Sequence, residues 1–218
     1  MRSPIHREGW PFIAVFAVLN FLIWEFSHGA ALAFLPLTLW CIAFFRDPER
    51  TPPPGDNLLV SPADGKLLPI VEAVPPEELG LGPAPRQRLS IFMNVFNVHV
   101  NRMPLSGTVA ALAYRPGRFI NASFDKASEY NERMSLRLRP LGATDPAADL
   151  AVVQIAGLVA RRIVCDVKEG ATVQRGERYG IIRFGSRLDV YLPPTAKIVV
   201  QEGSVTRAGE TVLAELQS

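Results

Sequence analysis

The feature that most constrains this chain is an apolar stretch near its N-terminus, which runs from Pro11 to Phe45. It is interrupted mainly at Asn20 and within residues 25–29, where a glutamate, a serine, a histidine and a glycine gather. The stretch is too long for the apolar region of a signal peptide, and no small-residue cleavage site follows before its second half. We therefore expect a helical hairpin attached to a membrane. The alternative, a buried hairpin of a soluble core, suits less well the placement of Trp10, Trp24 and Trp40.

Each half of this stretch is short for a membrane span. The halves comprise 14 residues from Pro11 to Trp24 and 16 residues from Ala30 to Phe45, whereas a span needs about 20 residues. A hairpin dipping into one leaflet fits these lengths, and so do two tilted short spans. Because arginines flank both ends, the positive-inside rule places both ends in the cytoplasm. These arginines are Arg2, Arg7, Arg46 and Arg50.

A proline-rich linker at residues 46–56, R-D-P-E-R-T-P-P-P-G-D, marks a domain boundary. We expect residues 1–50 to form the membrane-associated hairpin and residues 51–218 to form a cytoplasmic catalytic domain of mainly β structure. The predicted fold class is therefore mainly β (α+β), with a barrel-sandwich-like β domain after a helical hairpin. Runs with strand character are 58–61, 66–73, 88–95, 98–100, 107–114, 133–139, 150–155 and 163–167, followed by a C-terminal set.

The last fifty residues contain an internal repeat. Glu169-Gly170 precedes Gly176-Glu177 with the same spacing as Glu202-Gly203 precedes Gly209-Glu210, and the two copies are 33 residues apart. Such paired strand-turn units predict two β-layers folded over each other about a pseudo-two-fold axis. The pattern resembles the barrel-sandwich of biotinyl and lipoyl carrier domains. Those carriers need a lysine at the exposed hairpin, and residues 185–187 of this chain include none.

Between the two copies lies a short corner sequence. Apolar and polar residues alternate on both sides of Gly185-Ser186, which predicts two strands that meet at a tight corner. We expect this corner to expose the peptide bond between the two residues and the serine hydroxyl. A Gly-Ser pair alone is more typical of an ordinary turn, so its surroundings must decide its role.

Composition removes some classes of function. Lysine and arginine number 23 against 21 aspartates and glutamates, and the formal net charge of +2 gives no basis for a nucleic-acid partner. The two cysteines make neither a disulfide framework nor a zinc site. We expect no metal and a reducing, cytoplasm-facing environment.

Three residues of the β domain have side chains that suit acid–base chemistry. His99 is the histidine outside the N-terminal segment, Asp64 lies in a Pro-Ala-Asp-Gly turn, and Ser186 lies at the corner. An activated serine needs a nucleophile, a base and a carboxylate that orients the base. Taken singly, a histidine on a strand and an aspartate in a turn are more often structural. Together, the three residues are candidate catalytic groups.

These residues lie in ordered motifs by which the chain resembles the phosphatidylserine decarboxylase proenzymes in their short bacterial form. The resemblance covers nearly the whole chain, and several motifs in order are far more specific than any one of them. They are F-F-R-D-P-E-R at 44–50, S-P-A-D-G-K at 61–66, F-N-V-H-V-N-R-M-P at 96–104, N-A-S-F-D-K-A-S-E-Y-N-E-R at 121–133 and F-G-S-R-L-D-V at 184–190.

The resemblance implies a zymogen that makes its own cofactor. The Ser186 hydroxyl would attack the Gly185 carbonyl, and the chain would be cut into residues 1–185 and 186–218. The shorter chain would then begin with a covalent pyruvoyl group derived from Ser186. Phosphatidylserine would form a Schiff base with this group and lose carbon dioxide to give phosphatidylethanolamine, with His99 as the proton donor.

One motif departs from the family pattern. Longer members carry two histidines in H-x-x-H-M-P, and the second is paired with the aspartate for self-cleavage. In this chain His99 matches the first histidine, and Arg102 stands at the second. Either His99 serves both reactions, or Asp64 acts with a different helper.

The resemblance also implies a substrate site and partners. Residues 121–133 would line the pocket, and arginines could hold a phosphate or carboxylate bidentately. Implied partners are phosphatidylserine and membrane lipid, the two chains of the cleaved proenzyme and, as an option, further copies in a homo-oligomer. The implied location is the inner cell membrane, with the catalytic domain in the cytoplasm. Candidate substrate-binding residues are Asn121, Arg102, Arg115, Arg118 and Arg133.

Two other functions remain compatible with the residues. A membrane-tethered, non-catalytic barrel-sandwich adaptor would keep Gly185-Ser186 as a plain turn and would be indifferent to Ser186→Ala. A close enzymatic variant would decarboxylate a related serine-headed ether lipid. An assay on matched lipids would separate the two decarboxylases.

Overall fold

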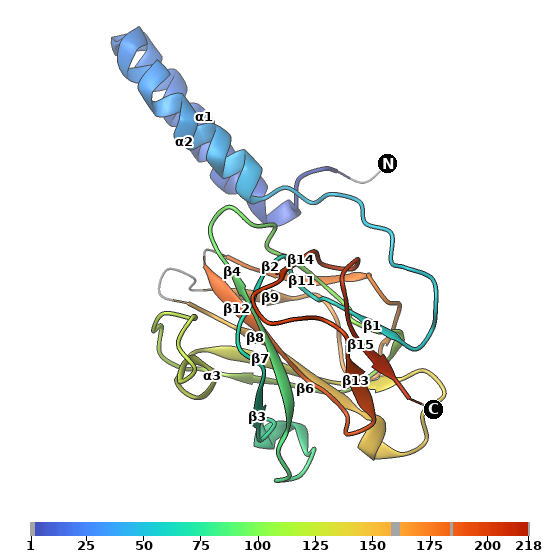
Figure 1. Cartoon of the computed structure of the whole chain (residues 1–218). Helices are drawn as coiled ribbons and strands as arrows, with labels where there is room; N and C mark the ends of the chain where they lie inside the picture. Colours follow the sequence, from blue (N-terminus) through green and yellow to red (C-terminus); the bar gives the residue numbers. More distant parts are fainter. Residues whose placement is uncertain (1–2, 158–161, 184, 218) are drawn as a thin grey trace. The chain divides into compact units, whose positions relative to one another are not determined.

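The computed structural model describes residues 3–157, 162–183 and 185–217. The chain divides into two compact units. The first comprises residues 1–49 with Phe96–Val98, and the second comprises Arg50–Val95 with His99–Ser218. The expected fold class, a mainly β domain preceded by apolar helices, is confirmed (Figure 1).

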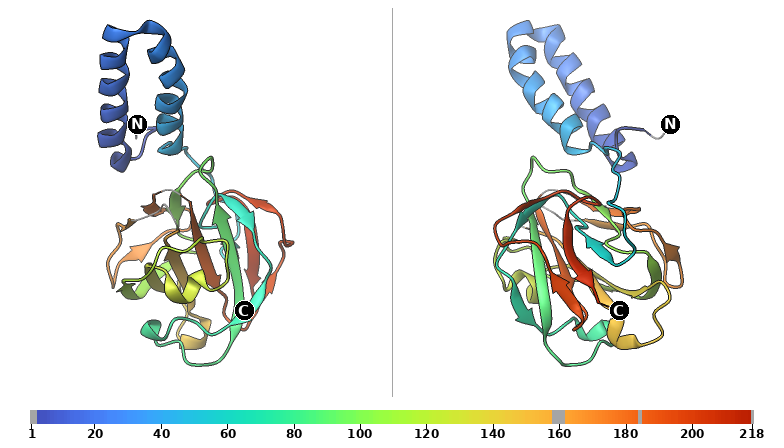
Figure 2. Two further views of the ribbon diagram at one scale, coloured as in Figure 1. Left: turned by 90° about the vertical axis from the view of Figure 1, so that its left-hand side faces the viewer. Right: turned by 45° about the vertical axis from the view of Figure 1, so that its right-hand side comes forward.

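Two antiparallel helices form the first unit. A short 3-10 helix, η1 (Arg7–Gly9), leads into α1 (Trp10–Phe26), and α2 (His28–Phe44) runs back beside α1 (Figure 2). The turn consists of Ser27, whose backbone is extended and whose hydroxyl accepts a hydrogen bond from the Ala30 amide at 3.3 Å. Each helix has 17 residues and is longer than the arms expected from the sequence. Residues on both sides of Ser27 continue the helices, so the break is shorter than residues 25–29.

Helix α1 carries apolar side chains on all of its sides. That helix contains no buried residue, and Phe21 and Phe26 are among its exposed side chains. Among the described residues, Arg7–Phe26 is the one helical stretch long and apolar enough to cross a bilayer, with 20 residues and a mean hydropathy of 1.6. A helix that is apolar all round is typical of a segment surrounded by other apolar material, such as lipid.

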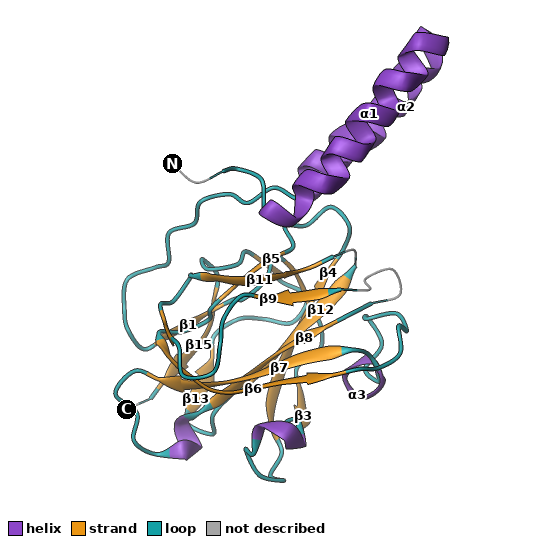
Figure 3. Ribbon diagram, turned by 180° about the vertical axis from the view of Figure 1, so that it is seen from behind, coloured by secondary structure: helices purple, strands orange, loops and turns teal. Residues whose placement is uncertain are grey.

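A large antiparallel sheet dominates the second unit. Its strands follow the order β10-β6-β7-β8-β12-β4-β2-β14, and β3 pairs with a separate part of β4. Figure 3 labels the strands β6, β7, β8, β12 and β4 of this sheet. The strand that begins at Ser186, β12, therefore lies in the middle of the sheet, between β8 and β4. The bounds are β2 (Gly65–Leu67), β3 (Val71–Ala73), β4 (Arg86–Met93), β6 (Gly107–Arg115), β7 (Arg133–Pro140), β8 (Leu150–Ile155), β10 (Thr172–Val173), β12 (Ser186–Tyr191) and β14 (Val205–Thr206).

Two three-stranded sheets complete the β structure, with the orders β1-β15-β13 and β5-β11-β9. Short helical segments occur in the connections, including α3 (Ala127–Tyr130), η2 (Glu77–Leu79) and η3 (Pro146–Ala148). The strands of the small sheets are β1 (Leu58–Val60), β5 (Val100–Arg102), β9 (Ile163–Cys165), β11 (Arg178–Ile182), β13 (Ala196–Ile198) and β15 (Val212–Leu216).

Several predicted strands differ from the observed ones. The runs 88–95 and 163–167 correspond to β4 and β9 with one or both ends shifted by two residues, and two other runs differ more. The run 66–73 is broken into β2 and β3, because Pro69 has no amide hydrogen and the Ile70 amide donates to the Glu202 carboxylate at 2.7 Å instead of to a strand. The strand predicted at 98–100 begins only at Val100. His99 therefore precedes β5 rather than lying within it.

The repeat in the sequence corresponds to a repeat in the structure. Strands β9, β10 and β11 have counterparts β13, β14 and β15, and β5 and β6 have counterparts β1 and β2. Equivalent strands make equivalent pairs, since β10 pairs with β6 as β14 pairs with β2. Hydrogen bonds cross the pseudo-two-fold axis reciprocally: the Val60 amide donates to Pro104 O and the Arg102 amide to Pro62 O, both at 2.9 Å.

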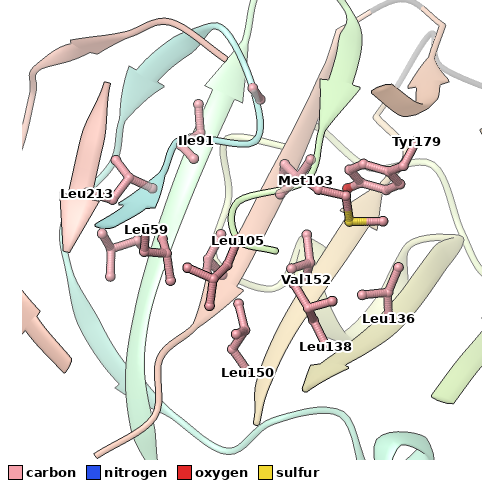
Figure 4. Close-up of a cluster of buried hydrophobic side chains, with 14 of the residues drawn as sticks. Leu59, Ile91, Met103, Leu105, Leu136, Leu138, Leu150, Val152, Tyr179 and Leu213 are labelled. Atoms are coloured by element: carbon pink, nitrogen blue, oxygen red, sulfur yellow. The ribbon is translucent and has the colours of Figure 1, made fainter. Parts of the chain in front are cut away.

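A large apolar core fills the space between the sheets, and a smaller buried cluster lies around Tyr191 and Val153. In the large core, leucines, isoleucines and valines from both copies of the repeat meet with Met103 and Tyr179 (Figure 4). Leu188 and Val190 of β12 also belong to the large core and are fully buried. The strand that carries the serine corner is thus anchored by apolar packing along one of its faces.

Candidate active site

The Gly185-Ser186 corner joins two different sheets. Strand β11 ends at Ile182 in a small sheet, and β12 begins at Ser186 in the large one. Gly185 has a φ of 60°, in the left-handed region where a side chain is disfavoured. The predicted corner is therefore present, and a glycine suits its backbone.

Ser186 is fully buried, contrary to the exposed position expected from the sequence. It pairs with Met93 across the β12–β4 ladder, and its hydroxyl lies 4.0 Å from the Met93 sulfur. A thioether is a weak acceptor. The hydroxyl is thus shielded from water without being held by a strong acceptor in that contact.

The carbonyl group of Gly185 is tightly packed against a second glycine. A Cβ atom placed on Gly157 would collide with Gly185 O and would lie 3.4 Å from the Ala122 side chain. Only a glycine at residue 157 leaves room for the carbonyl oxygen in this position. The carbonyl group that self-cleavage would attack therefore packs against Gly157, just after the end of β8, and the Ala122 side chain lies near the same glycine.

His99 is fully buried at the point where the chain enters β5. Val100 pairs with Ile181, so His99 comes beside the end of β11 that leads to the corner. The side chain of Asn101, two residues further on, donates to the Met93 sulfur at 3.7 Å. It also accepts a hydrogen bond from the side-chain amide of Gln154 at 2.8 Å. Met93 thus links Ser186 to the strand that follows His99.

Asp64 lies on the other side of β4 from Ser186. Lys66 and Arg187 are both paired with Phe92, so the start of β2 and the start of β12 lie two strand spacings apart, about 10 Å. The Asp64 carboxylate accepts from the Ala208 amide at 2.7 Å and from the Arg50 guanidinium at 3.0 Å. The structure thus gives Asp64 a partner, Arg50, that the sequence did not suggest.

Behind Ser186, the opposite face of β12 carries a buried ionic network. Arg187 is 1% exposed; its Nε lies 2.8 Å from the fully buried Asp189 carboxylate. Its guanidinium also donates to the carbonyl oxygens of Ala122 at 3.1 Å and Phe124 at 2.8 Å. Arg187 therefore joins the strand of the serine to the segment of Ala122 and Phe124, which passes near Gly157.

Two neighbours extend this network. Ser128 donates to Asp189 at 3.0 Å, and the Arg88 guanidinium donates to Ser128 at 3.1 Å. Burial, followed by the charge of Asp189, raises the pKa of Tyr191 to about 12. The sequence analysis missed Arg187 and Asp189, although their alternation with Ser186 and Leu188 placed both on one face of a strand.

The five candidate substrate-binding residues lie in different environments, because two are bound to acceptors inside the protein and three are exposed. Arg133 makes a bidentate ion pair with Glu78, with N–O distances of 2.8 and 2.9 Å, and Arg102 donates to Gly176 O at 2.9 Å. Burial alone would raise the pKa of Glu78, but the hydrogen bonds from Arg133 and Ser135 outweigh it and lower this pKa. The remaining candidates, Asn121, Arg115 and Arg118, are exposed.

Comparison with known proteins assigns the chain to a family. The family model described as phosphatidylserine decarboxylase matches residues 37–214. The phosphatidylserine decarboxylase proenzyme of Cereibacter sphaeroides is 56% identical over 99% of this chain and 91% of the relative. The proenzymes of Rickettsia akari and Rickettsia felis are each 54% identical, over 97% of this chain and 90% of their own. This chain therefore belongs to the phosphatidylserine decarboxylase family and is a carboxy-lyase.

Proposed function

We propose that this protein cuts itself between Gly185 and Ser186 and then decarboxylates phosphatidylserine with the resulting pyruvoyl group. The observation that carries the proposal is the corner itself. A glycine with positive φ presents its carbonyl next to a fully buried serine at the first position of a central strand. A buried site without bulk water favours acyl transfer to the serine over hydrolysis of the peptide bond.

Self-cleavage would use groups of this chain alone. The Ser186 Oγ attacks the Gly185 carbonyl carbon and loses its proton, the peptide C–N bond breaks, and the nitrogen takes up a proton. The acyl group is then an ester on Ser186. Removal of the serine α-proton expels the Gly185 carboxylate, and hydrolysis of the resulting enamine releases ammonia and leaves a pyruvoyl group at residue 186.

The residues around the corner fit such a group. It would occupy the buried position of Ser186, between the Met93 side chain and the end of β8. A pyruvoyl group supplies a ketone that takes up the substrate amine and a conjugated carbonyl that accepts electrons as carbon dioxide leaves. No cavity for a separate cofactor is needed at this position.

We assign the proton transfers to His99 and a supporting role to Asp64. His99 is buried beside the strand end that leads to the corner, and imidazole is suited to accepting and returning protons near neutral pH. It would return a proton to the α-carbon of the product. Asp64 is bound to Arg50 and to a backbone amide, which favours a role in holding the site over direct proton transfer.

For the lipid headgroup we propose the exposed members of the candidate set. Arg115 and Arg118 lie on the exposed side of their segment, and Asn121 begins the motif that contains Ala122. Guanidinium groups bind phosphate and carboxylate well. Arg133 and Arg102 are less suitable, because each already serves an acceptor inside the protein.

We place the enzyme at the inner cell membrane with its β domain in the cytoplasm. The apolar helix Arg7–Phe26 supports membrane attachment, and the arginines near both ends of the hairpin support a cytoplasmic location for those ends. Attachment would bring the site to its lipid substrate, so that the acyl tails need only partly leave the bilayer.

The test is an intact mass spectrum of the purified protein beside Ser186→Ala, together with release of carbon dioxide from phosphatidylserine vesicles. We expect two chains for the wild type, the shorter one blocked at its N-terminus and modified by borohydride in the presence of an amine. Ser186→Ala should remain one chain and be inactive. A folded wild type that remains one chain and still decarboxylates would overturn the pyruvoyl mechanism.

A further inference from the structure

The pseudo-two-fold repeat provides an internal control for the role of Asp64. Asp64 precedes Gly65 at the start of β2, and Ser106 precedes Gly107 at the start of the equivalent strand, β6. The Ala208 amide donates to Asp64 at 2.7 Å, and the equivalent Arg175 amide donates to Ser106 at 3.0 Å. A serine thus makes the same contact in the symmetry-related turn. Capping this turn does not require a carboxylate.

What distinguishes Asp64 is its second oxygen. Arg50 donates to it at 3.0 Å and, with its other terminal nitrogen, to Glu210 at 3.1 Å. The counterpart of Glu210 in the other copy is Glu177, which accepts from the Gln174 amide within its own turn at 2.8 Å. Asp64 and Glu210 thus both bind one arginine, whereas their counterparts Ser106 and Glu177 serve local turns.

The pair is well shielded. The side chains of Arg50 and Asp64 are each 12% exposed, so their attraction is screened less than that of a surface ion pair. Arg50 lies at the start of the second unit, and its Cβ is within 3.7 Å of the Cβ position that Gly209 would have. One linker residue thereby fixes both the turn that contains Asp64 and the turn that contains Gly209.

The Arg50–Asp64 ion pair lies at the end of the sheet where the serine strand, β12, begins. Asp64 leads directly into β2, whose Lys66 pairs with Phe92 of β4, and Phe92 pairs with Arg187 of β12. The next residue of β4, Met93, contacts the Ser186 hydroxyl. A displacement at Asp64 is therefore separated from Ser186 by a single strand.

We propose that Arg50 is a positioning residue for self-cleavage, acting through its ion pair with Asp64. The pair holds the start of β2, and through β4 it fixes the Ser186 hydroxyl relative to the Gly185 carbonyl. The proposal rests on the self-cleavage proposed above. It goes beyond it by assigning to an arginine of the linker a part in forming the active enzyme.

The experiment follows conversion of the full chain into two chains after synthesis in the presence of phospholipid vesicles. Asp64→Ser installs the residue that serves the equivalent turn, and Arg50→Ala removes the partner. We expect each to slow cleavage about tenfold or more, as a barrier increase of about 1.4 kcal/mol or more would do. The double variant should be no slower than the slower single variant, because both lose one interaction.

Two further measurements separate positioning from general support of the fold. Guanidinium ion at a concentration far below denaturing levels should restore cleavage of Arg50→Ala but not of Ser186→Ala. Thermal melting, in a Ser186→Ala background, should show that Asp64→Ser retains a cooperative fold. Ser106→Ala, which alters the equivalent turn of the other copy, should cleave at the wild-type rate.

Each contrary outcome has a distinct meaning. If the wild type does not cleave, the proposed function fails. If the wild type cleaves and Asp64→Ser or Arg50→Ala cleaves equally fast, the ion pair has no part in cleavage. If the variants lose their fold together with cleavage, or if guanidinium ion restores nothing, the pair supports the fold in general and the positioning role is wrong.

Discussion

The two faces of β12 are held in opposite ways. On the inner face, Leu188 and Val190 follow Ser186 and pack in the apolar core. On the outer face, Arg187 and Asp189 are also buried but form an ion pair at 2.8 Å. A strand with alternating polar and apolar residues usually has one solvated face. Here both faces are shielded from water. The inner face of the serine strand is held by apolar packing, and the outer face is held by the ion pair together with the packing of Tyr191 in a smaller apolar cluster.

The two faces of β12 should respond differently to substitution. Apolar packing tolerates side chains of similar volume, whereas a buried charge requires its partner. The outer network also contacts the carbonyl oxygens of Ala122 and Phe124, while the inner face contacts only the core. We therefore expect the outer face to govern the surroundings of the Gly185 carbonyl and the inner face to govern stability.

The largest effect on stability should come from Asp189→Asn. This change leaves the buried Arg187 guanidinium without its carboxylate, whereas Arg88 keeps its ion pair with Asp125. Breaking a buried pair costs about 3–5 kcal/mol. The measurement is unfolding by urea in the Ser186→Ala background, where a single chain unfolds. The exposed Glu72→Gln is the control and should stay within about 0.5 kcal/mol of its parent. If Asp189→Asn and Glu72→Gln lower the free energy of unfolding equally, the buried ion pair of Asp189 does not contribute to stability.

On the inner face, Leu188→Ala should cost about 3 kcal/mol by the same measurement. Leu188 is fully buried in the core, and the lost transfer energy adds to the energy of the cavity left behind. Leu188→Met keeps the volume and should cost less than about 1.5 kcal/mol. If the methionine variant is as unstable as the alanine variant, the inner face is not held by volume.

Arg187→Lys tests the outer face more specifically, because it keeps the positive charge but removes the planar guanidinium group. We expect a loss of about 1–3 kcal/mol, since a lysine cannot reach Asp189 and two carbonyl oxygens together. Amide hydrogen exchange should increase at residues 122–126, whose carbonyl contacts are lost. The exposed Arg115→Lys should change neither quantity. Unaltered exchange at residues 122–126 would show that Arg187 does not hold this segment.

The smallest effect concerns pH. Tyr191 has a pKa of about 12 in the fold, above its ordinary value of 10.0, so the unfolded chain loses this proton first as pH rises. The free energy of unfolding is unaffected below pH 10 and should fall between pH 10 and 12, by on the order of 1 kcal/mol per pH unit. Urea midpoints for the Ser186→Ala parent and for the same chain with Tyr191→Phe test this. An identical slope in both would exclude Tyr191 as its source.

Local patterns in the sequence predicted the local structure well. The apolar stretch gave two helices, and the runs at 107–114, 133–139 and 150–155 are strands β6, β7 and β8. The Glu-Gly and Gly-Glu pairs marked the repeat, because turns that need positive φ select glycine wherever they recur. The relevant φ angles are 82° at Gly170 and 78° at Gly176, Gly203 and Gly209.

Pairings between distant segments could not be predicted in the same way. Nothing in the alternation of residues 186–191 says that β12 lies between β4 and β8, and an alternating strand with a free face would expose Arg187. The burial of Ser186 and the pairing of Asp64 with Arg50 likewise depend on where other segments fold. The family motifs supplied the candidate residues of the site, but the contacts of these residues required the fold.

The position of β12 also determines what a cut at Gly185 would leave behind. The shorter product would contribute the central strand between β8 and β4, and its later strands β14 and β15 would still pair with β2 and β1 of the longer one. Two such products would therefore be interwoven and could not separate without unfolding. Maturation would change the connectivity of the polypeptide but not its architecture, and the new reactive end would remain enclosed where it was made.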